Sequence, residues 1–448
     1  MSAISGAISM LGWDHATMMP DGGAEARATQ LSTLSVLKHE IITAPEMSDL
    51  LAAADARASE LDFWQSANLR EMRHAWTHAS AVPGDLVESL SIAASRCEMA
   101  WRQARADNDF ATLAPLLEEL INLVRKSGEA RGEALRISAY DALIDQFDPG
   151  GRQAAIDPLF AKLRTFLPEL LKQVMERQAA GKPAVAPAGP FPPARQEKLA
   201  RALMTRLGFD FNHGRLDTSH HPFSGGVPQD SRITTRYDED DFTSGLMAVI
   251  HETGHSQYER SLPQDWLEQP VGRARGMTMH ESQSLLFEMQ AARSPEFITY
   301  LSWLVGEHFG GDKSQYQADS LLRIYHKVSP GLIRVDADEV TYPLHIILRY
   351  RIERQLIAGT LKVVDLPAAW RFGMRELLGV VPETDTDGCM QDIHWPSGAF
   401  GYFPSYTLGA LAAAQIFTAA RGNDTTIIPA ISKCDFAPLN DWLRTNIH

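Results

Sequence analysis

Residues 246–255 read Leu-Met-Ala-Val-Ile-His-Glu-Thr-Gly-His, and the fold of the chain is deduced outward from this stretch. Its apolar residues predict a helix with one buried face. On a helix, His251 and His255 lie one turn apart on the same face, where two imidazoles can chelate one metal ion. Glu252 flanks that face and can take a proton from a water molecule. Gly254 weakens a helix mildly, and its missing side chain leaves room for a close neighbour.

A catalytic metal held by two histidines needs a third protein ligand and one open coordination position. The chain offers His280-Glu281-Ser282-Gln283 downstream. A glutamate from a following helix completes a set of two histidines and one glutamate, so we expect Glu281 to be the third ligand. His280 is more typical of a histidine that packs behind a ligand or in the core. The alternative ligands are three other glutamates: Glu259, Glu268 and Glu288.

The one clear strand signal of the sequence lies just before this motif. Residues 232–237 alternate and contain β-branched side chains, which predicts a short strand. Residues 238–241 are acidic and favour a helix N-terminus, because the helix dipole is positive there. We expect helices to resume at Phe242 and to continue to about Leu378. The aromatic, Gly-rich stretch 398–406 then precedes further helix.

The first 180 residues predict one helix after another, because apolar residues recur three and four positions apart. The clearest periodic stretches are Leu31–His39, Leu50–Leu61, Leu86–Ala104 and Leu113–Val124. Residues 148–151 (Asp-Pro-Gly-Gly) end this run, and a helix follows from about Asp157 to Ala179. Residues 182–193 are rich in Pro and Gly and predict an extended loop or linker. We expect one large helical domain over residues 1–448, with two sub-lobes of about 1–180 and 195–448 as an option.

Composition excludes several classes of protein. The chain has 448 residues, 44% of them hydrophobic, so it can bury a large core. Its net charge of −14 disfavours a nucleic-acid binder, which needs a basic face. Three cysteines, none in a Cys-x-x-Cys pair, favour a reducing compartment. No targeting segment and no stretch of about 18 apolar residues stands out, so we expect a cytoplasmic protein that does not enter a membrane.

Six blocks of the sequence resemble, in the same order, those of the M32 metallocarboxypeptidase family typified by thermostable carboxypeptidase Taq. The resemblance spans nearly the whole chain, and six ordered blocks are far more specific than one motif. The blocks are His221-Pro222-Phe223, Asp230 to Thr234 (Asp-Ser-Arg-Ile-Thr), His251 to His255, His280 to Gln283, Ile333 to Asp338 and Gly388 to Trp395.

The resemblance implies a mostly α fold of the zincin class (a gluzincin with the His-Glu-x-x-His motif). It implies an elongated multi-helix molecule with a deep central groove, a small β element near the active site, and a homodimer. It also implies an enzyme that releases single C-terminal amino acids from peptides with broad specificity and acts poorly on proline. Zn²⁺ is the expected metal, and Co²⁺ is the alternative.

The resemblance, read together with the chemistry of the residues, assigns roles at the site. His251, His255 and Glu281 would hold the metal, and Glu252 would be the general base and then carry the proton to the leaving amine. Arginine suits a free carboxylate because its planar fork binds both oxygens. The arginine candidates are Arg334 and Arg232, each inside a matched block.

A second donor beside the metal would stabilise the oxyanion of the tetrahedral intermediate. The candidates are His394, Tyr402 and Tyr406, with Tyr406 also a substrate contact. Asp230 and Thr234 are expected to shape a strand that pairs with the substrate backbone. Simpler interpretations stay open: Arg334 can form a structural ion pair with Asp336 or Asp338, and an aromatic run is more often packing than catalysis.

Two other functions compete with the carboxypeptidase. An endo-acting metallo-oligopeptidase uses the same metal motif, and only the carboxylate-binding residues and the closed end of the groove distinguish the two. A helical scaffold without activity is the second rival, and the intact Glu252 argues against it, because losing the base is the easiest way to lose activity.

Overall fold

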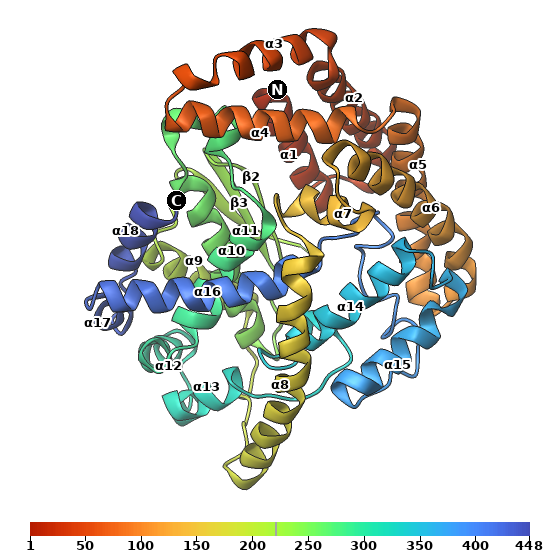
Figure 1. Ribbon diagram of the computed structural model, residues 1–448. Coiled ribbons are helices and arrows are strands. Elements are labelled where there is room, and N and C mark those ends of the chain that lie inside the picture. Colours follow the sequence, from red (N-terminus) through yellow and green to blue (C-terminus); the bar gives the residue numbers. More distant parts are fainter. Residues whose placement is uncertain (220–221) are drawn as a thin grey trace.

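The computed structural model describes residues 1–219 and 222–448, so His221 of the first matched block lies outside the described residues (Figure 1). Helices dominate the described chain, as the sequence predicted. The N-terminal helices are α1 (Ser2–Thr17), α2 (Ala24–Thr43), α3 (Pro45–Ala56), α4 (Phe63–Ser80), α5 (Gly84–Asp107), α6 (Phe110–Leu135), α7 (Ala139–Phe147), α8 (Gln153–Ala180) and α9 (Pro193–Arg206). The later helices are α10 (Phe242–Ser261), α11 (Met277–Leu285), α12 (Pro295–Phe309), α13 (Ala318–Tyr325), α14 (Tyr342–Ile357), α15 (Leu366–Leu378), α16 (Pro404–Asn423), α17 (Ile427–Ile431) and α18 (Ala437–Asn446).

Several boundaries predicted from the sequence are confirmed. The Asp-Pro-Gly-Gly stop lies between α7 and α8, and the Pro-rich stretch connects α8 to α9 without secondary structure. Helix α10 begins at Phe242 as expected. Other boundaries differ, for example those of α3, which begins at Pro45 and ends at Ala56, whereas the apolar pattern predicted Leu50–Leu61. Proline at the first position of a helix fixes φ at no cost in hydrogen bonds, which explains the earlier start.

The small sheet has three strands, β1 (Gly214–Thr218), β2 (Ser224–Val227) and β3 (Asp230–Thr235), in the order β1-β3-β2. Strand β1 pairs parallel with β3, and β2 pairs antiparallel with it. The sequence predicted only the third strand, at 232–237. Strand β2 contains two glycines and β1 is largely polar, and such residues carry little β propensity.

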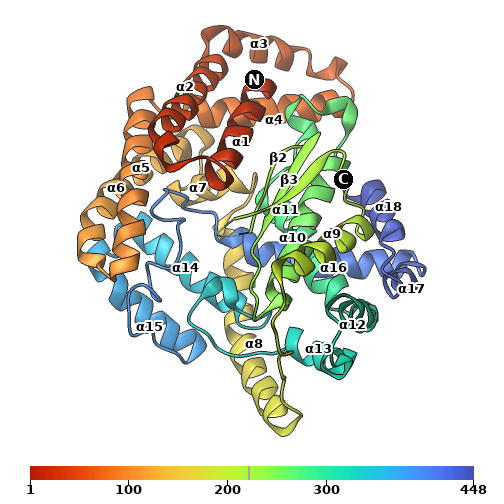
Figure 2. The same cartoon turned by 180° about the vertical axis from the view of Figure 1, so that it is seen from behind.

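The two faces of the sheet meet different helices (Figure 2). On one face, Ile233 packs with Val249 of α10, and the Ser231 hydroxyl donates to the Ser256 hydroxyl at 2.7 Å. On the other face, the guanidinium of Arg232 lies 4.8 Å from the ring centre of Trp13 in α1. Alternate residues of β3 therefore point to α10 and to α1, as the pleat of a strand requires.

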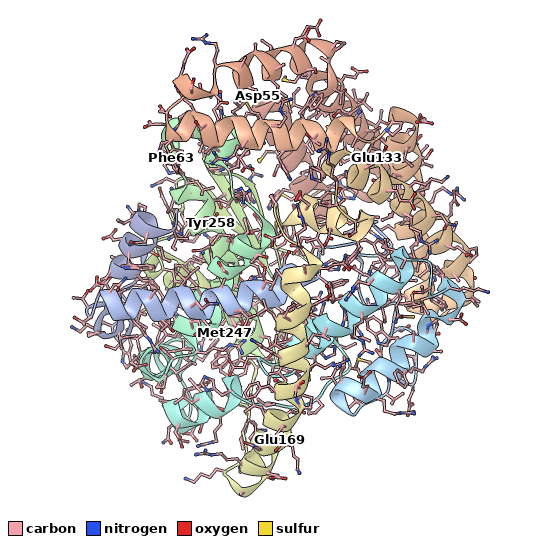
Figure 3. All side chains as sticks on the ribbon, in the orientation of Figure 1. Asp55, Phe63, Glu133, Glu169, Met247 and Tyr258 are labelled. Carbon is pink, nitrogen blue, oxygen red and sulfur yellow. The ribbon has the colours of Figure 1, made fainter. Side chains whose placement is uncertain are left out.

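Helix α11 is held between α10 and α16 by close contacts at two glycines. A Cβ atom at Gly254 would lie 2.8 Å from the Gln283 carbonyl oxygen of α11. A Cβ at Gly409 of α16 would lie 2.8 Å from Cβ of Glu281 on the opposite side of α11. The space that the sequence indicated beside Gly254 is thus filled by the backbone of α11. Figure 3 labels Met247 and Tyr258, which lie toward opposite ends of α10.

Two large groups of buried apolar side chains surround these central helices. The first combines residues 93–171 of the N-terminal helices with residues 328–403, which include α14 and α15. The second draws on residues 191–443 and includes α12, α17 and α18. In residues 1–219 and 222–448, none of the helices combines the length and apolarity that crossing a membrane requires.

Candidate metal centre and active site

The motif helix starts on a side-chain cap. Asp241 accepts a hydrogen bond from the Thr243 backbone N–H at 2.8 Å, which satisfies one of the free donors of the first turn. From this fixed start, α10 carries His251 and His255 on one face, with ring centres 5.0 Å apart. The last residue of the acidic stretch is therefore the N-cap of the helix, at the N-terminus that the sequence predicted.

Glu281 of α11 faces both histidines. Its Oε1 lies 3.9 Å from Nε2 of His251, and its Oε2 lies 3.6 Å from Nε2 of His255. Each residue offers one ligand atom within 4.8 Å of the other two. These separations are too long for hydrogen bonds but match ligands placed about 2.0–2.2 Å around a common ion. The three side chains thus fit a divalent metal, and two imidazoles with one carboxylate are the donor set that zinc takes in catalytic sites.

Two of the competing glutamates, Glu259 and Glu288, lie against histidine rings. Glu259 lies 2.9 Å from Nε2 of His280, and the His280 ring packs 4.4 Å from the ring of His255. Glu288 lies outside the group formed by His251, His255 and Glu281 (the metal triad). Its Oε2 is 2.9 Å from Nδ1 of His251. His280 therefore packs behind a ligand, as its type suggested.

The sequence offered Glu288 only as an alternative third ligand. In the structure it contacts a histidine of the motif instead. It lies on a π-helix, Leu286–Ala292, that continues α11. Its second oxygen accepts a hydrogen bond from Arg293. Burial raises the pKa of Glu288, but Arg293 and the His251 hydrogen bond outweigh it and lower the pKa to about 2. The ionised carboxylate fixes the His251 ring and leaves Nε2 free to face the metal site.

Glu252 is buried beside the triad. Burial raises its pKa, the charge of His251 opposes that shift, and a hydrogen bond from the Ser224 side chain also lowers it. Ser224 of β2 pairs with Ile233 and so shares the sheet face that meets α10. Ser224 follows Pro222-Phe223 directly, but no motif pointed to it, because its approach to Glu252 depends on the register of the sheet.

Arg334 is buried in an ion pair. Its Nε and Nη2 each lie 2.9 Å from Oδ1 of Asp392, and its Nη1 donates to the Tyr342 hydroxyl at 2.9 Å. Arg349 lies on the other oxygen of Asp392, with Nε at 2.7 Å. The ion pair that the sequence left open with Asp336 or Asp338 is formed with Asp392 instead. Two guanidiniums share one carboxylate, so the cluster keeps one surplus positive charge.

The aromatic candidates gather beside Arg334. Nε2 of His394 lies 3.1 Å from the Tyr406 hydroxyl, and the Tyr402 and Tyr406 ring centres are 5.3 Å apart. The guanidinium of Arg334 lies 4.9 Å from the Tyr406 ring centre. Burial lowers the pKa of His394 to about 3 and raises the pKa of both tyrosines. The imidazole is therefore neutral and both phenols are protonated donors.

A buried carboxylate holds the segment that carries these aromatic residues. Glu353 of α14 accepts hydrogen bonds from the Tyr140 hydroxyl (2.7 Å), the Trp395 indole (2.9 Å) and the Gly401 backbone N–H (3.0 Å). Burial raises its pKa to about 7. Glu353 thus anchors both ends of the stretch between His394 and Tyr402, and no sequence motif had indicated this role.

Asp230 and Arg232 lie away from α10 and its two histidines. They pair with each other at 2.6 Å and occupy the face of β3 that meets Trp13, not α10. The expectation that this strand pairs with a substrate backbone is wrong for β3, because β1 and β2 occupy both of its edges. The strand was predicted at 232–237 and lies at Asp230–Thr235, but its place in the middle of the sheet was not predicted.

Comparisons with known proteins agree over the whole chain. A family model described as carboxypeptidase Taq (M32) metallopeptidase matches residues 1–448. Thermostable carboxypeptidase 1 of Thermus thermophilus is 37% identical over 98% of this chain and 88% of its own length. Metallocarboxypeptidase 1 of Trypanosoma cruzi superposes with a TM-score of 0.96 at 40% identity, covering 99% of this chain and 89% of its own. The M32 carboxypeptidase of Deinococcus radiodurans R1 gives 0.93 at 34% identity, with 99% and 89% covered.

Proposed function

The chain belongs to the carboxypeptidase Taq (M32) metallopeptidase family and is a metallocarboxypeptidase, and on that basis we propose how its residues share the reaction. The substrate is a peptide with a free C-terminus, and the products are a single amino acid and the shortened peptide. The observation that supports this most directly is the convergence of His251, His255 and Glu281 on one point beside the buried Glu252.

The metal is a divalent cation, and zinc is our proposal, with cobalt as the alternative. The donor set of two imidazoles and one carboxylate supports zinc. When bound, such an ion polarises the scissile carbonyl and lowers the pKa of water to about 7. His251, His255 and Glu281 would hold it, and Glu288 keeps the first imidazole in the required orientation. Metal analysis of the purified protein tests the identity of the ion.

Glu252 takes the proton of the attacking water and passes it to the leaving amine. Its raised pKa supports this role, because a base works best when its pKa approaches the working pH. Ser224, on the sheet face toward α10, favours the ionised form of this carboxylate. His394, Tyr402 and Tyr406 provide the uncharged donors that we assign to the developing oxyanion and to the substrate.

Arg334 is our choice for the group that recognises the substrate's C-terminal carboxylate. The surplus positive charge shared by Arg334 and Arg349 over Asp392 supports it, as does its position beside Tyr406. Arg232 has a weaker claim, because it is paired with Asp230 on the sheet face away from α10. Capture of the free carboxylate is what separates a carboxypeptidase from an endo-acting oligopeptidase.

A mass-spectrometric time course on one N-acetylated octapeptide tests the proposal. We expect successive loss of single C-terminal residues by the metal-loaded protein. Glu252→Gln should abolish this cleavage while keeping the metal, and Glu268→Gln, an exposed glutamate, is the matched control. Internal cuts would favour the oligopeptidase. No cleavage with any divalent metal would favour a scaffold without activity.

We also propose a single-domain, cytoplasmic homodimer of broad specificity. The first buried core joins residues 93–171 to residues 328–403, which supports one domain across the two sub-lobes considered above. Three free, buried cysteines support a reducing compartment. Exposed apolar side chains of the N-terminal helices support an interface between copies, namely Met18, Val36, Leu37, Leu50, Phe63 and Trp64. Light scattering on the purified protein tests the dimer.

A further inference from the structure

A second cluster of metal-ligating side chains lies outside the active site, between α4 and α7. Nε2 of His74 lies 2.9 Å from Oδ1 of Asp145, and Nε2 of His78 lies 3.3 Å from the same oxygen. The three ligand atoms lie within 4.8 Å of one another. Among the described residues, only this cluster and the catalytic triad form such a group.

The cluster repeats the construction of the catalytic triad. Two histidines one turn apart on a helix face a carboxylate from another helix, as His251, His255 and Glu281 do. The local sequence is His-Ala-Trp-Thr-His, so Ala75 stands where the catalytic motif has its glutamate. A metal at this second position would have no adjacent general base. Such a site would hold the structure together and not hydrolyse a peptide.

The two oxygens of the Asp145 carboxylate have different partners, and only Oδ1 faces the two histidines. Oδ2 of Asp145 accepts hydrogen bonds from the Gly150 backbone N–H at 3.0 Å and from Arg152 at 3.1 Å. Oδ1 is thereby turned toward both imidazoles. Outer partners that fix a ligand in this way are typical of metal sites.

The distances suit a metal ion without rearrangement of the helices. Ligands about 2.0–2.1 Å from zinc in a tetrahedral arrangement are about 3.3 Å apart. The two measured separations, 2.9 and 3.3 Å, need to change by only a few tenths of an ångström. His74 also borders a cavity of about 430 Å³, together with Asp55, Arg70 and Thr77. Figure 3 labels Asp55 among the N-terminal helices beside α4.

The ligand set decides which ion the cluster would hold. Arg152 contacts Oδ2 of Asp145 and not the Oδ1 that faces the histidines. The ligands would be two imidazoles and one carboxylate. That set suits a borderline-soft divalent ion such as Zn²⁺ and not Ca²⁺ or Mg²⁺, which take oxygen ligands.

We propose that His74, His78 and Asp145 form a second, structural zinc site that ties α4 to α7. Helix α7 also packs against the active site, because its Phe147 ring lies 5.1 Å from the Tyr402 ring centre. An ion at the cluster would thus connect the N-terminal helices to the wall that supports Tyr402.

The test counts zinc in the full-length protein. The metal-stripped protein is loaded with Zn²⁺ and desalted. Elemental mass spectrometry then measures the number of zinc ions per chain, and calorimetry follows zinc binding. We expect two zinc ions per chain in the wild type and one in both His78→Gln and His74→Gln. Glutamine keeps a donor that can reach Asp145, so each variant can retain the hydrogen bond that links the helices.

His213→Gln is the matched control, because His213 also pairs with a carboxylate, Asp210, but without a second histidine. It should keep two zinc ions. The proposal is overturned if the wild type binds one zinc ion, or if both His78→Gln and His74→Gln still bind two. Circular dichroism shows that the variants are folded, and the retained catalytic zinc gives a second check of folding.

Discussion

Nδ1 of His251 lies 2.9 Å from Oε2 of Glu288, and Glu288 is itself held by Arg293. This chain of contacts runs from the motif helix to the π-helix that follows α11. It fixes which nitrogen of His251 faces Glu281 and His255, so the geometry of the proposed metal site depends on a residue outside the three proposed ligands.

Glu288→Gln should weaken metal binding by about 10- to 100-fold, the usual effect of removing an outer carboxylate from a ligand histidine. Competition with a chromogenic chelator measures the change. Glu259→Gln is the control, because Glu259 contacts His280, which is not a ligand. Equal metal affinity in the wild type and Glu288→Gln would contradict the role assigned to Glu288.

Ser224→Ala should lower kcat roughly tenfold while the metal content stays at the wild-type level. The variant loses the hydroxyl that favours the ionised form of Glu252, and polar contacts to charged groups contribute about 1.5–3 kcal/mol. Steady-state kinetics with metal analysis measures both quantities, and Ser224→Thr should restore the rate. Ser231→Ala serves as control, since Ser231 faces the same helix but donates to Ser256. A wild-type kcat in Ser224→Ala would remove Ser224 from the site.

Arg334→Gln should raise KM for peptides with a free C-terminal carboxylate and reduce the preference for them over C-terminal amides. Truncating one partner of a buried charged pair costs about 2–5 kcal/mol, so the preference should fall by at least tenfold. The ratio of kcat/KM for the two peptides measures it and is insensitive to the fraction of folded enzyme. Arg232→Gln should leave this ratio unchanged. If Arg232→Gln alone changes it, the two arginines have been assigned the wrong way round.

Glu353 should make stability depend on pH. Its pKa is about 7 in the folded chain and ordinarily 4.5, so the folded chain binds the extra proton between these values. The stabilisation is complete below pH 4.5 and is lost as pH rises to about 7. Thermal unfolding should therefore show Glu353→Gln closer to the wild type at pH 8 than at pH 5. A difference that is constant with pH, as expected for the exposed Glu307→Gln control, would contradict this.

Helical spacing alone predicts that His251 and His255 lie together, but it does not place Glu281, which comes from another helix. Other features depend on packing that no local pattern encodes. The side of β3 that meets α10 is set by the register of three strands, so Arg232 could not be oriented from its block. Glu288 faces His251 from a π-helix, whose winding shifts side chains relative to an α-helix.

Arg334 illustrates the same limit over a longer distance. Its partner Asp392 is 58 residues away in the sequence, and nearer acids such as Asp338 are used elsewhere. Asp338 instead accepts hydrogen bonds from the Ser329, Val340 and Thr341 backbone N–H groups. Sequence neighbours therefore suggested an ion pair of the right kind with the wrong acid.

Gly254 and Gly409 bracket the helix that carries Glu281, one from each side. A mutational library at these two positions should yield few active clones, because a methyl group added at either glycine would clash with α11 and displace Glu281 relative to the histidines. Attempts to change the preferred metal should therefore begin with the donor atoms themselves. Helices α10, α11 and α16 are packed so closely that substitutions cannot change the spacing between them without disturbing the site.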